Sequence, residues 1–107
     1  MALGLAAYAV PAVAAADAEA AQSLARQNNC FKCHSVDKDK DGPSFQRTVR
    51  RFAGRSDAEQ SLVKHLTSGE TAIFPDGHEE PHKIVKTVPP QDMNQIRNLV
   101  RWILEQK

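Results

Sequence analysis

The two cysteines of this chain lie close together in the stretch CFKCH, where Cys30 and Cys33 are followed at once by His34. Thiols and an imidazole at this spacing can close a disulfide, form half of a zinc site, act as a redox dithiol or attach a cofactor covalently. Because the chain has no other cysteine, we look first to this stretch for the chemistry of the protein.

Three of these interpretations explain the spacing poorly. A disulfide across two residues closes a very short loop and so removes little entropy from the unfolded chain. Zinc needs four tetrahedral ligands, and the remaining candidates, His65, His78 and His82, form no second paired element. A thioredoxin-like dithiol follows a strand, and no run of β-branched residues precedes Cys30.

The pattern C-x-x-C-H is that of a covalent haem attachment site. Two thiols add to the two vinyl groups on one side of the macrocycle, so they must be a short turn apart. The histidine that follows brings its imidazole beneath the ring, where it meets the iron as the proximal ligand. We therefore expect one haem c, with Cys30 and Cys33 as its thioether anchors and His34 on its iron.

The length of 107 residues predicts one small domain with a limited apolar core, which a haem would help to fill. The net charge is +1, from 14 basic and 13 acidic residues, so nothing in the composition suggests a nucleic-acid binder.

The chain opens with an apolar, alanine-rich stretch, MALGLAAYAVPAVAAADAEA. Its small residues offer an A-x-A cleavage point before Asp17, so residues 1–16 are predicted to be a cleaved secretory signal and 17–107 the mature domain. The basic start usual in such signals is absent, since the first basic residue is Arg26. A membrane anchor is the alternative, but the run is broken by Pro11 and is shorter than the about 20 residues that span a bilayer.

Apolar periodicity and capping residues predict four helices. The first is capped by Asp17, the second ends at Gly54, the third begins with Ser56 and Glu59 as a capping box, and the last is capped by Asp92 with Gln95 three residues on. Their ranges are 17–29, 44–54, 56–69 and 92–107. Residues 70–91 hold four prolines and no sustained period. We expect them to form a long functional loop without strands.

Three stretches in order resemble the small bacterial class I monohaem c-type cytochromes over residues 17–107. They are LARQNNCFKCH, then DGPSF, then IRNLVRWILEQK. The resemblance implies an all-α fold of about four helices around one haem. The first and last helices are expected to cross, and Ala21 to meet the face of the last helix that carries Trp102. The resemblance also implies that the Pro43 carbonyl accepts the Nδ1 hydrogen of His34, which orients the ligand and raises its basicity.

The second axial ligand stays open. Familiar members of this family use a methionine from the loop before the last helix, often directly before a Pro-Pro pair, where this chain has Val88. Met93 is one candidate, although it shares a helix face with Ile96 and Val100 and so fits a core position.

Histidine is the alternative ligand type. EEPH resembles an EE-x-H element of some small relatives, so we expect His82 as the distal iron ligand. Met93, His78, a lysine or no protein ligand remain as alternatives, and His65 is expected at the surface or rim. A second histidine would give a lower potential than methionine.

The resemblance implies a soluble, monomeric periplasmic electron-transfer protein, not an enzyme, that exchanges single electrons with periplasmic redox proteins. Two alternatives are a ligand-binding or sensing cytochrome, or weak peroxidase, with an open or labile distal site, and a haem domain docked in a larger complex. Four arginines in or directly after the second helix could steer an acidic partner, although a solvated helix face explains them better. They are Arg47, Arg50, Arg51 and Arg55.

Overall fold

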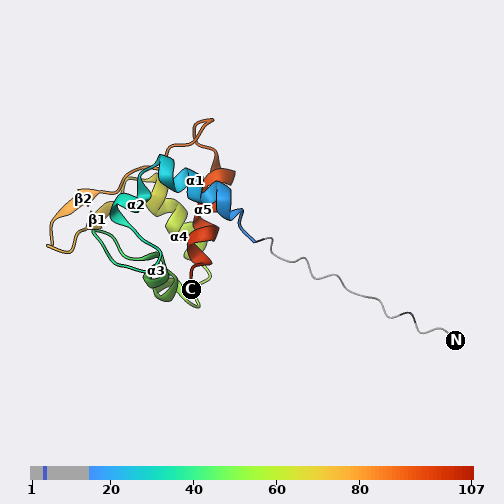
Figure 1. Ribbon diagram of the computed structural model, residues 1–107, viewed down its shortest axis with the longest axis horizontal. Helices are drawn as coiled ribbons and strands as arrows, with labels where there is room; N and C mark the ends of the chain where they lie inside the picture. The colour runs from blue at the N-terminus through green and yellow to red at the C-terminus, as the bar shows by residue number, and fades with distance from the viewer. Residues whose placement is uncertain (1–3, 5–14) are drawn as a thin grey trace.

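The computed structural model describes residue 4 and residues 15–107. The predicted signal therefore lies almost wholly outside the described residues. Figure 1 shows a helical body with a small hairpin at one edge. The elements are α1 (Ala18–Gln27), α2 (Cys30–Cys33), α3 (Phe45–Phe52), α4 (Ala58–Thr67), β1 (Thr71–Ile73), β2 (Glu79–Pro81) and α5 (Met93–Leu104). In the described part of the chain, no helix has the length and apolar character that a bilayer crossing needs.

Helix α5 is the centre of the packing, because α1, α3 and α4 all contact it. Its apolar face is buried, and Ile96, Leu99 and Val100 are almost fully shielded from solvent. On α1, Ala21 is fully buried. Trp102 packs edge-on against Phe45, with ring centroids 5.6 Å apart. The four predicted helices are confirmed, and the short α2 adds one turn at the cysteines.

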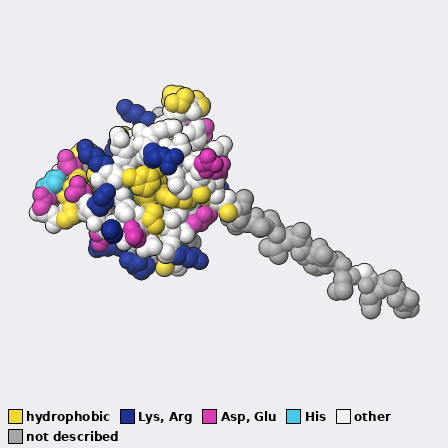
Figure 2. Space-filling view, in the orientation of Figure 1, with side chains coloured by type: hydrophobic (Ala, Val, Ile, Leu, Met, Phe, Trp, Pro, Cys, Tyr) yellow, Lys and Arg dark blue, Asp and Glu magenta, His cyan; other side chains and the backbone are white. Residues whose placement is uncertain are grey.

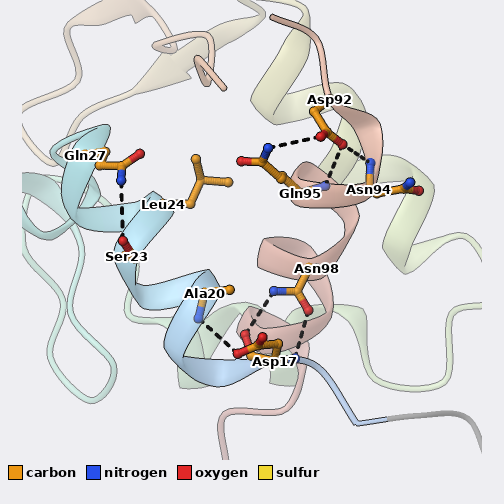
Figure 3. A pocket seen from close by; sticks show the side chains of 9 residues that line it. All are labelled: Asp17, Ala20, Ser23, Leu24, Gln27, Asp92, Asn94, Gln95 and Asn98. Carbon is orange, nitrogen blue, oxygen red and sulfur yellow. Dashed lines mark hydrogen bonds between the residues drawn. The ribbon is translucent and has the colours of Figure 1, made fainter. Parts of the chain in front are cut away.

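Two of the predicted N-caps are confirmed. The Asp17 carboxylate accepts from the backbone N–H of Ala20 at 3.0 Å, and the Asp92 carboxylate accepts from those of Asn94 and Gln95 at 3.0 and 3.2 Å. Figure 3 shows both caps facing the groove between α1 and α5. There Asn98 bonds the backbone N–H of Asp17 at 2.8 Å and its carbonyl at 2.9 Å, which joins the start of α1 to α5.

The predicted capping box at Ser56 and Glu59 is wrong. Helix α4 begins at Ala58 with Asp57 as its N-cap. Asp57 is held in this position by the Arg55 guanidinium, at 2.7 and 3.0 Å, and by the Ser61 hydroxyl at 3.2 Å. The helix start is therefore moved one residue beyond the one that the sequence pattern favours.

The expectation that residues 70–91 contain no strand is also wrong. Strands β1 and β2 pair antiparallel, with Ala72 opposite Glu80. The turn lies in FPDGH, where Gly77 takes φ of 90° and its N–H bonds the Phe74 carbonyl at 2.9 Å. A Pro-Asp-Gly sequence is a hairpin signal with a physical basis, because glycine adopts positive φ without steric cost. The strands escaped prediction because each has only three residues and is largely exposed.

Candidate functional site

The short helix α2 brings the two cysteines onto one turn. It is preceded by Asn29 in the left-handed conformation, with φ of 57°, which redirects the chain out of α1. Both thiols are free and half-buried. Burial raises the pKa of the Cys30 thiol, and the positive charge of Lys83 opposes this increase. Two hydrogen bonds between Asn28 and the backbone of Lys86 place the segment after β2 near the cysteines.

His34 is held on two sides. Its Nδ1 donates to the Pro43 carbonyl at 2.8 Å, which leaves Nε2 as the nitrogen available to a metal. Its ring also lies directly against Gly42, where an added Cβ would come within 2.3 Å of Cε1. Burial lowers the pKa of His34, although its hydrogen bond to Pro43 opposes this. The ring is therefore neutral near pH 7, the form that binds metals.

His82 follows directly after β2 and is half-buried. Its backbone N–H donates to the Glu70 carbonyl at 2.8 Å, and its ring Nδ1 donates to the Lys83 carbonyl at 2.9 Å. As in His34, this leaves Nε2 available. Burial is the largest cause that lowers the pKa of His82, followed by the nearby His65. Two neutral histidines with available Nε2 atoms are thus placed in the same region.

The spacing of these two histidines fits a shared iron. The ring centroids of His34 and His82 lie 6.3 Å apart. Metal–imidazole bonds of about 2.0–2.1 Å, with about 1.1 Å from each nitrogen to its ring centre, give about 6.3 Å for two ligands on opposite sides of one metal. The free thiols of Cys30 and Cys33 lie one turn before His34. These residues therefore fit a covalently attached haem.

The donors do not fit a zinc site. Among the described residues, no three His, Cys, Asp or Glu side chains are arranged to hold a metal ion. A haem iron differs, because the macrocycle supplies four nitrogens and the protein need supply only the two axial ligands.

His65 was expected at the surface or rim. It is half-buried, and its ring centroid lies 4.1 Å from that of His82. Sequence reasoning missed this contact, although one signal was available. His65 lies three residues after the buried Leu62, a spacing that places it at the edge of the apolar face of α4.

The other candidates lie elsewhere. His78 is exposed at the hairpin tip, where it contacts Asp76 and bonds Glu80 at 3.1 Å. Met93 begins α5 and packs against the core cluster. Val88 is 88 % exposed, so it does not occupy a ligand position over the site. Of the two apolar residues that follow His82 most closely, Val85 is buried in the core and Ile84 is 51 % exposed, so Val85 can hold His82 inward and Ile84 cannot.

Comparison with known proteins agrees with this description. Residues 18–107 match the family described as cytochrome c. Cytochrome c-552 of Hydrogenobacter thermophilus is 28% identical over 88 residues, which cover 80% of this chain and 81% of that protein. Cytochrome c2 of Rhodocyclus tenuis is 27% identical over 89 residues, which cover 79% of this chain and 90% of that protein.

Solved structures show the same fold. The class 1 cytochrome MtoD from Sideroxydans lithotrophicus ES-1 is 54% identical, with a TM-score of 0.79 over 86% of this chain and 98% of that chain. Cytochrome c552 from Nitrosomonas europaea is 26% identical, with a TM-score of 0.61 over 80% of this chain and 99% of that chain. The likeness therefore extends over nearly the whole described domain.

Proposed function

Because this chain belongs to the cytochrome c family, we propose that it is a periplasmic carrier of single electrons whose haem iron is held by His34 and His82. The family makes it an electron-transfer haem protein with one covalently bound haem c. The proposal adds the pair of axial histidines and the compartment. The haem supplies the one-electron couple of its iron.

The chain's own residues anchor and orient the group. Cys30 and Cys33 provide the two thiols for attachment, so retention does not depend on a deep pocket. The Pro43 carbonyl fixes the His34 ring and strengthens its donation. A second imidazole in place of methionine favours the oxidised iron and so lowers the potential.

The observation that carries the proposal is the 6.3 Å between the rings of His34 and His82. The position of Met93 also favours the histidine pair, because the Met93 side chain packs against the core. Near-infrared magnetic circular dichroism of the oxidised protein tests it, since methionine and histidine ligation give bands at different energies. We expect the bis-nitrogen band in the natural protein and its loss in His82→Ala.

The matched control is His78→Ala, which removes a histidine of the same hairpin that lies at the exposed tip. It should leave the band unchanged. A methionine band in the natural protein, or an unchanged low-spin spectrum in His82→Ala, contradicts the ligand pair.

The periplasmic part of the proposal rests on the leader and on the chemistry of attachment, which c-type cytochromes complete outside the cytoplasmic membrane. The domain begins close to the proposed cleavage. Asp17, the first residue after that cleavage, caps α1, and its backbone carbonyl accepts from the Asn98 amide at 2.9 Å. Mass spectrometry of the periplasmic fraction should find a processed chain with one haem. Recovery of only the full-length chain from the cytoplasm contradicts export.

A second function, small-molecule binding at a labile distal site, is favoured by one observation. His82 directly follows a hairpin whose strands pack mainly against each other, so the segment before the ligand adds little to hold it in place. Carbon monoxide added to the reduced protein distinguishes the two functions. Rapid conversion of the spectrum supports ligand binding, and slow or absent conversion supports a carrier.

The arginines on α3 and just after it agree with a solvated surface more than with a docking site. Arg47 pairs with Asp39 at 3.0 Å, and Arg55 pairs with Asp57 at 2.7 Å. Figure 2 shows basic and acidic side chains of both signs around an apolar area on the visible face. We therefore propose a redox partner that is not selected by one strongly charged arginine patch.

A further inference from the structure

We infer that His65, held by Glu70, positions the ring of His82 and so sets the orientation of the distal imidazole on the iron. The inference rests on the proposed ligation by His82 and assigns a role to two residues outside the axial pair. His65 is a positioning residue, because it acts through His82.

The first observation is the contact between the two rings. Their centroids lie 4.1 Å apart with an angle of 44° between the planes. His65 belongs to α4, which packs against α5 and so is part of the helical body. This contact therefore links the His82 ring to the rigid part of the domain.

The second observation is that Glu70 holds both histidines. Its carboxylate bonds His65 Nδ1 at 2.8 Å, with both side chains about one third exposed. Its backbone carbonyl accepts the N–H of His82 at 2.8 Å. One residue thus fixes the position of the His65 ring and the point where the chain turns toward His82.

The third observation is that His82 has little other support for its ring besides His65 and Glu70. Its one ring hydrogen bond runs to the carbonyl of Lys83, the next residue in the chain. That bond fixes which nitrogen is protonated, but it moves with the segment and does not tie the ring to the helices. The hairpin adds little support, because β1 and β2 pack mainly against each other.

Loss of the His65 ring should therefore allow His82 to turn and to leave the iron more easily. The largest g value of the oxidised low-spin signal reports the angle between the two axial imidazole planes, which is 45° for His34 and His82. In His65→Ala we expect a shifted largest g value. We also expect carbon monoxide to bind the reduced protein roughly 10-fold faster or more, the usual scale for removing a residue that supports a metal ligand.

The Glu70 variants separate positioning from general damage. Glu70→Ala should reproduce His65→Ala, whereas Glu70→Gln retains an accepting oxygen and should resemble the natural protein. Because the two residues act through one contact, the double variant should be no more affected than either single one. His65→Phe keeps a ring against His82 and serves if His65→Ala fails to fold: it should preserve the g value better than any variant without a ring.

His78→Ala is the matched control, since His78 lies at the hairpin tip away from this contact. If the natural protein lacks the bis-nitrogen band, the proposed ligation fails. If that band is present, the His65 and Glu70 variants decide the positioning role. That role alone is overturned if both His65→Ala and Glu70→Ala match His78→Ala in largest g value and in carbon monoxide rate. His65→Phe takes the place of His65→Ala in this comparison if His65→Ala does not fold.

Discussion

Asn28 and Lys86 are 58 residues apart in sequence and share two hydrogen bonds. The Asn28 amide donates to the Lys86 carbonyl at 3.0 Å, and the Lys86 N–H donates to the Asn28 side-chain oxygen at 2.8 Å. Asn28 thus pairs with the backbone of Lys86 as a neighbouring strand would. Because Asn28 is the C-cap of α1, this pair fastens the segment after His82 to the start of the proposed haem attachment site.

Asn28→Ala should destabilise the domain. Asn28 is 5 % exposed, and its removal leaves the part-buried backbone N–H and carbonyl of Lys86 without their partner, which costs about 1–3 kcal/mol. Urea unfolding of the haem protein measures the loss, and amide exchange at Lys86 should accelerate. Gln27→Ala, on the exposed neighbour, is the control and should change the free energy of unfolding by less than about 0.5 kcal/mol. Equal stability of the two variants contradicts the role given to Asn28.

Gly42→Ala should displace His34, the proposed proximal ligand. A methyl group here would lie 2.3 Å from Cε1 and 2.7 Å from Nδ1 of His34, so the ring must move and its bond to the Pro43 carbonyl must lengthen. We expect a lower yield of low-spin haem protein and a changed midpoint potential. Asp41→Ala, at the exposed neighbour, should leave both unchanged. A natural spectrum and potential in Gly42→Ala contradict the prediction.

The hairpin tip should be most stable at mildly acidic pH. Hydrogen bonds to Asp76, the largest cause, and to Glu80 raise the pKa of His78 above its ordinary 6.5. The stability that protonated His78 contributes is therefore complete below pH 6.5 and is lost as pH rises through the raised pKa. The backbone N–H and ring of His78 lower the pKa of Asp76 below 3.8, so that contribution is complete above 3.8 and is lost as pH falls through the lowered value.

Amide exchange at Gly77, corrected for the intrinsic effect of pH, measures this stability. Protection of this amide should be greatest between pH 3.8 and pH 6.5, the ordinary pKa values of an aspartate and a histidine, and should decline at lower and higher pH. Asp76→Asn is the control and should flatten the profile. An equally pH-dependent profile in that variant assigns the effect to other groups.

The parts of this protein that depend on local pattern could be predicted from the sequence. The four main helices follow from apolar spacing, and the caps at Asp17 and Asp92 follow from residue type. The haem follows from C-x-x-C-H, because the spacing itself is what the chemistry needs.

The parts that depend on long-range contacts could not be predicted in this way. The start of α4 is set by the competing pair of Arg55 and Asp57, which a capping pattern does not reveal. The His65 contact with His82 depends on where the chain after β2 lies relative to α4. The spacing from Leu62 places His65 at the edge of the apolar face of α4 but does not indicate which residue it contacts. The hairpin itself was recognisable only from its turn, since its strands have no buried face.

The independence of the hairpin has an evolutionary consequence. Residues 71–81 pack mainly against one another, while the core is built from the helices. With His82 as the distal ligand, a substitution or insertion in this segment can change the chemical character of the iron and spare the free energy of folding. The redox potential and the thermal stability of such a protein can then be selected separately. Relatives with the same helices can exchange electrons with donors and acceptors of very different reduction potential.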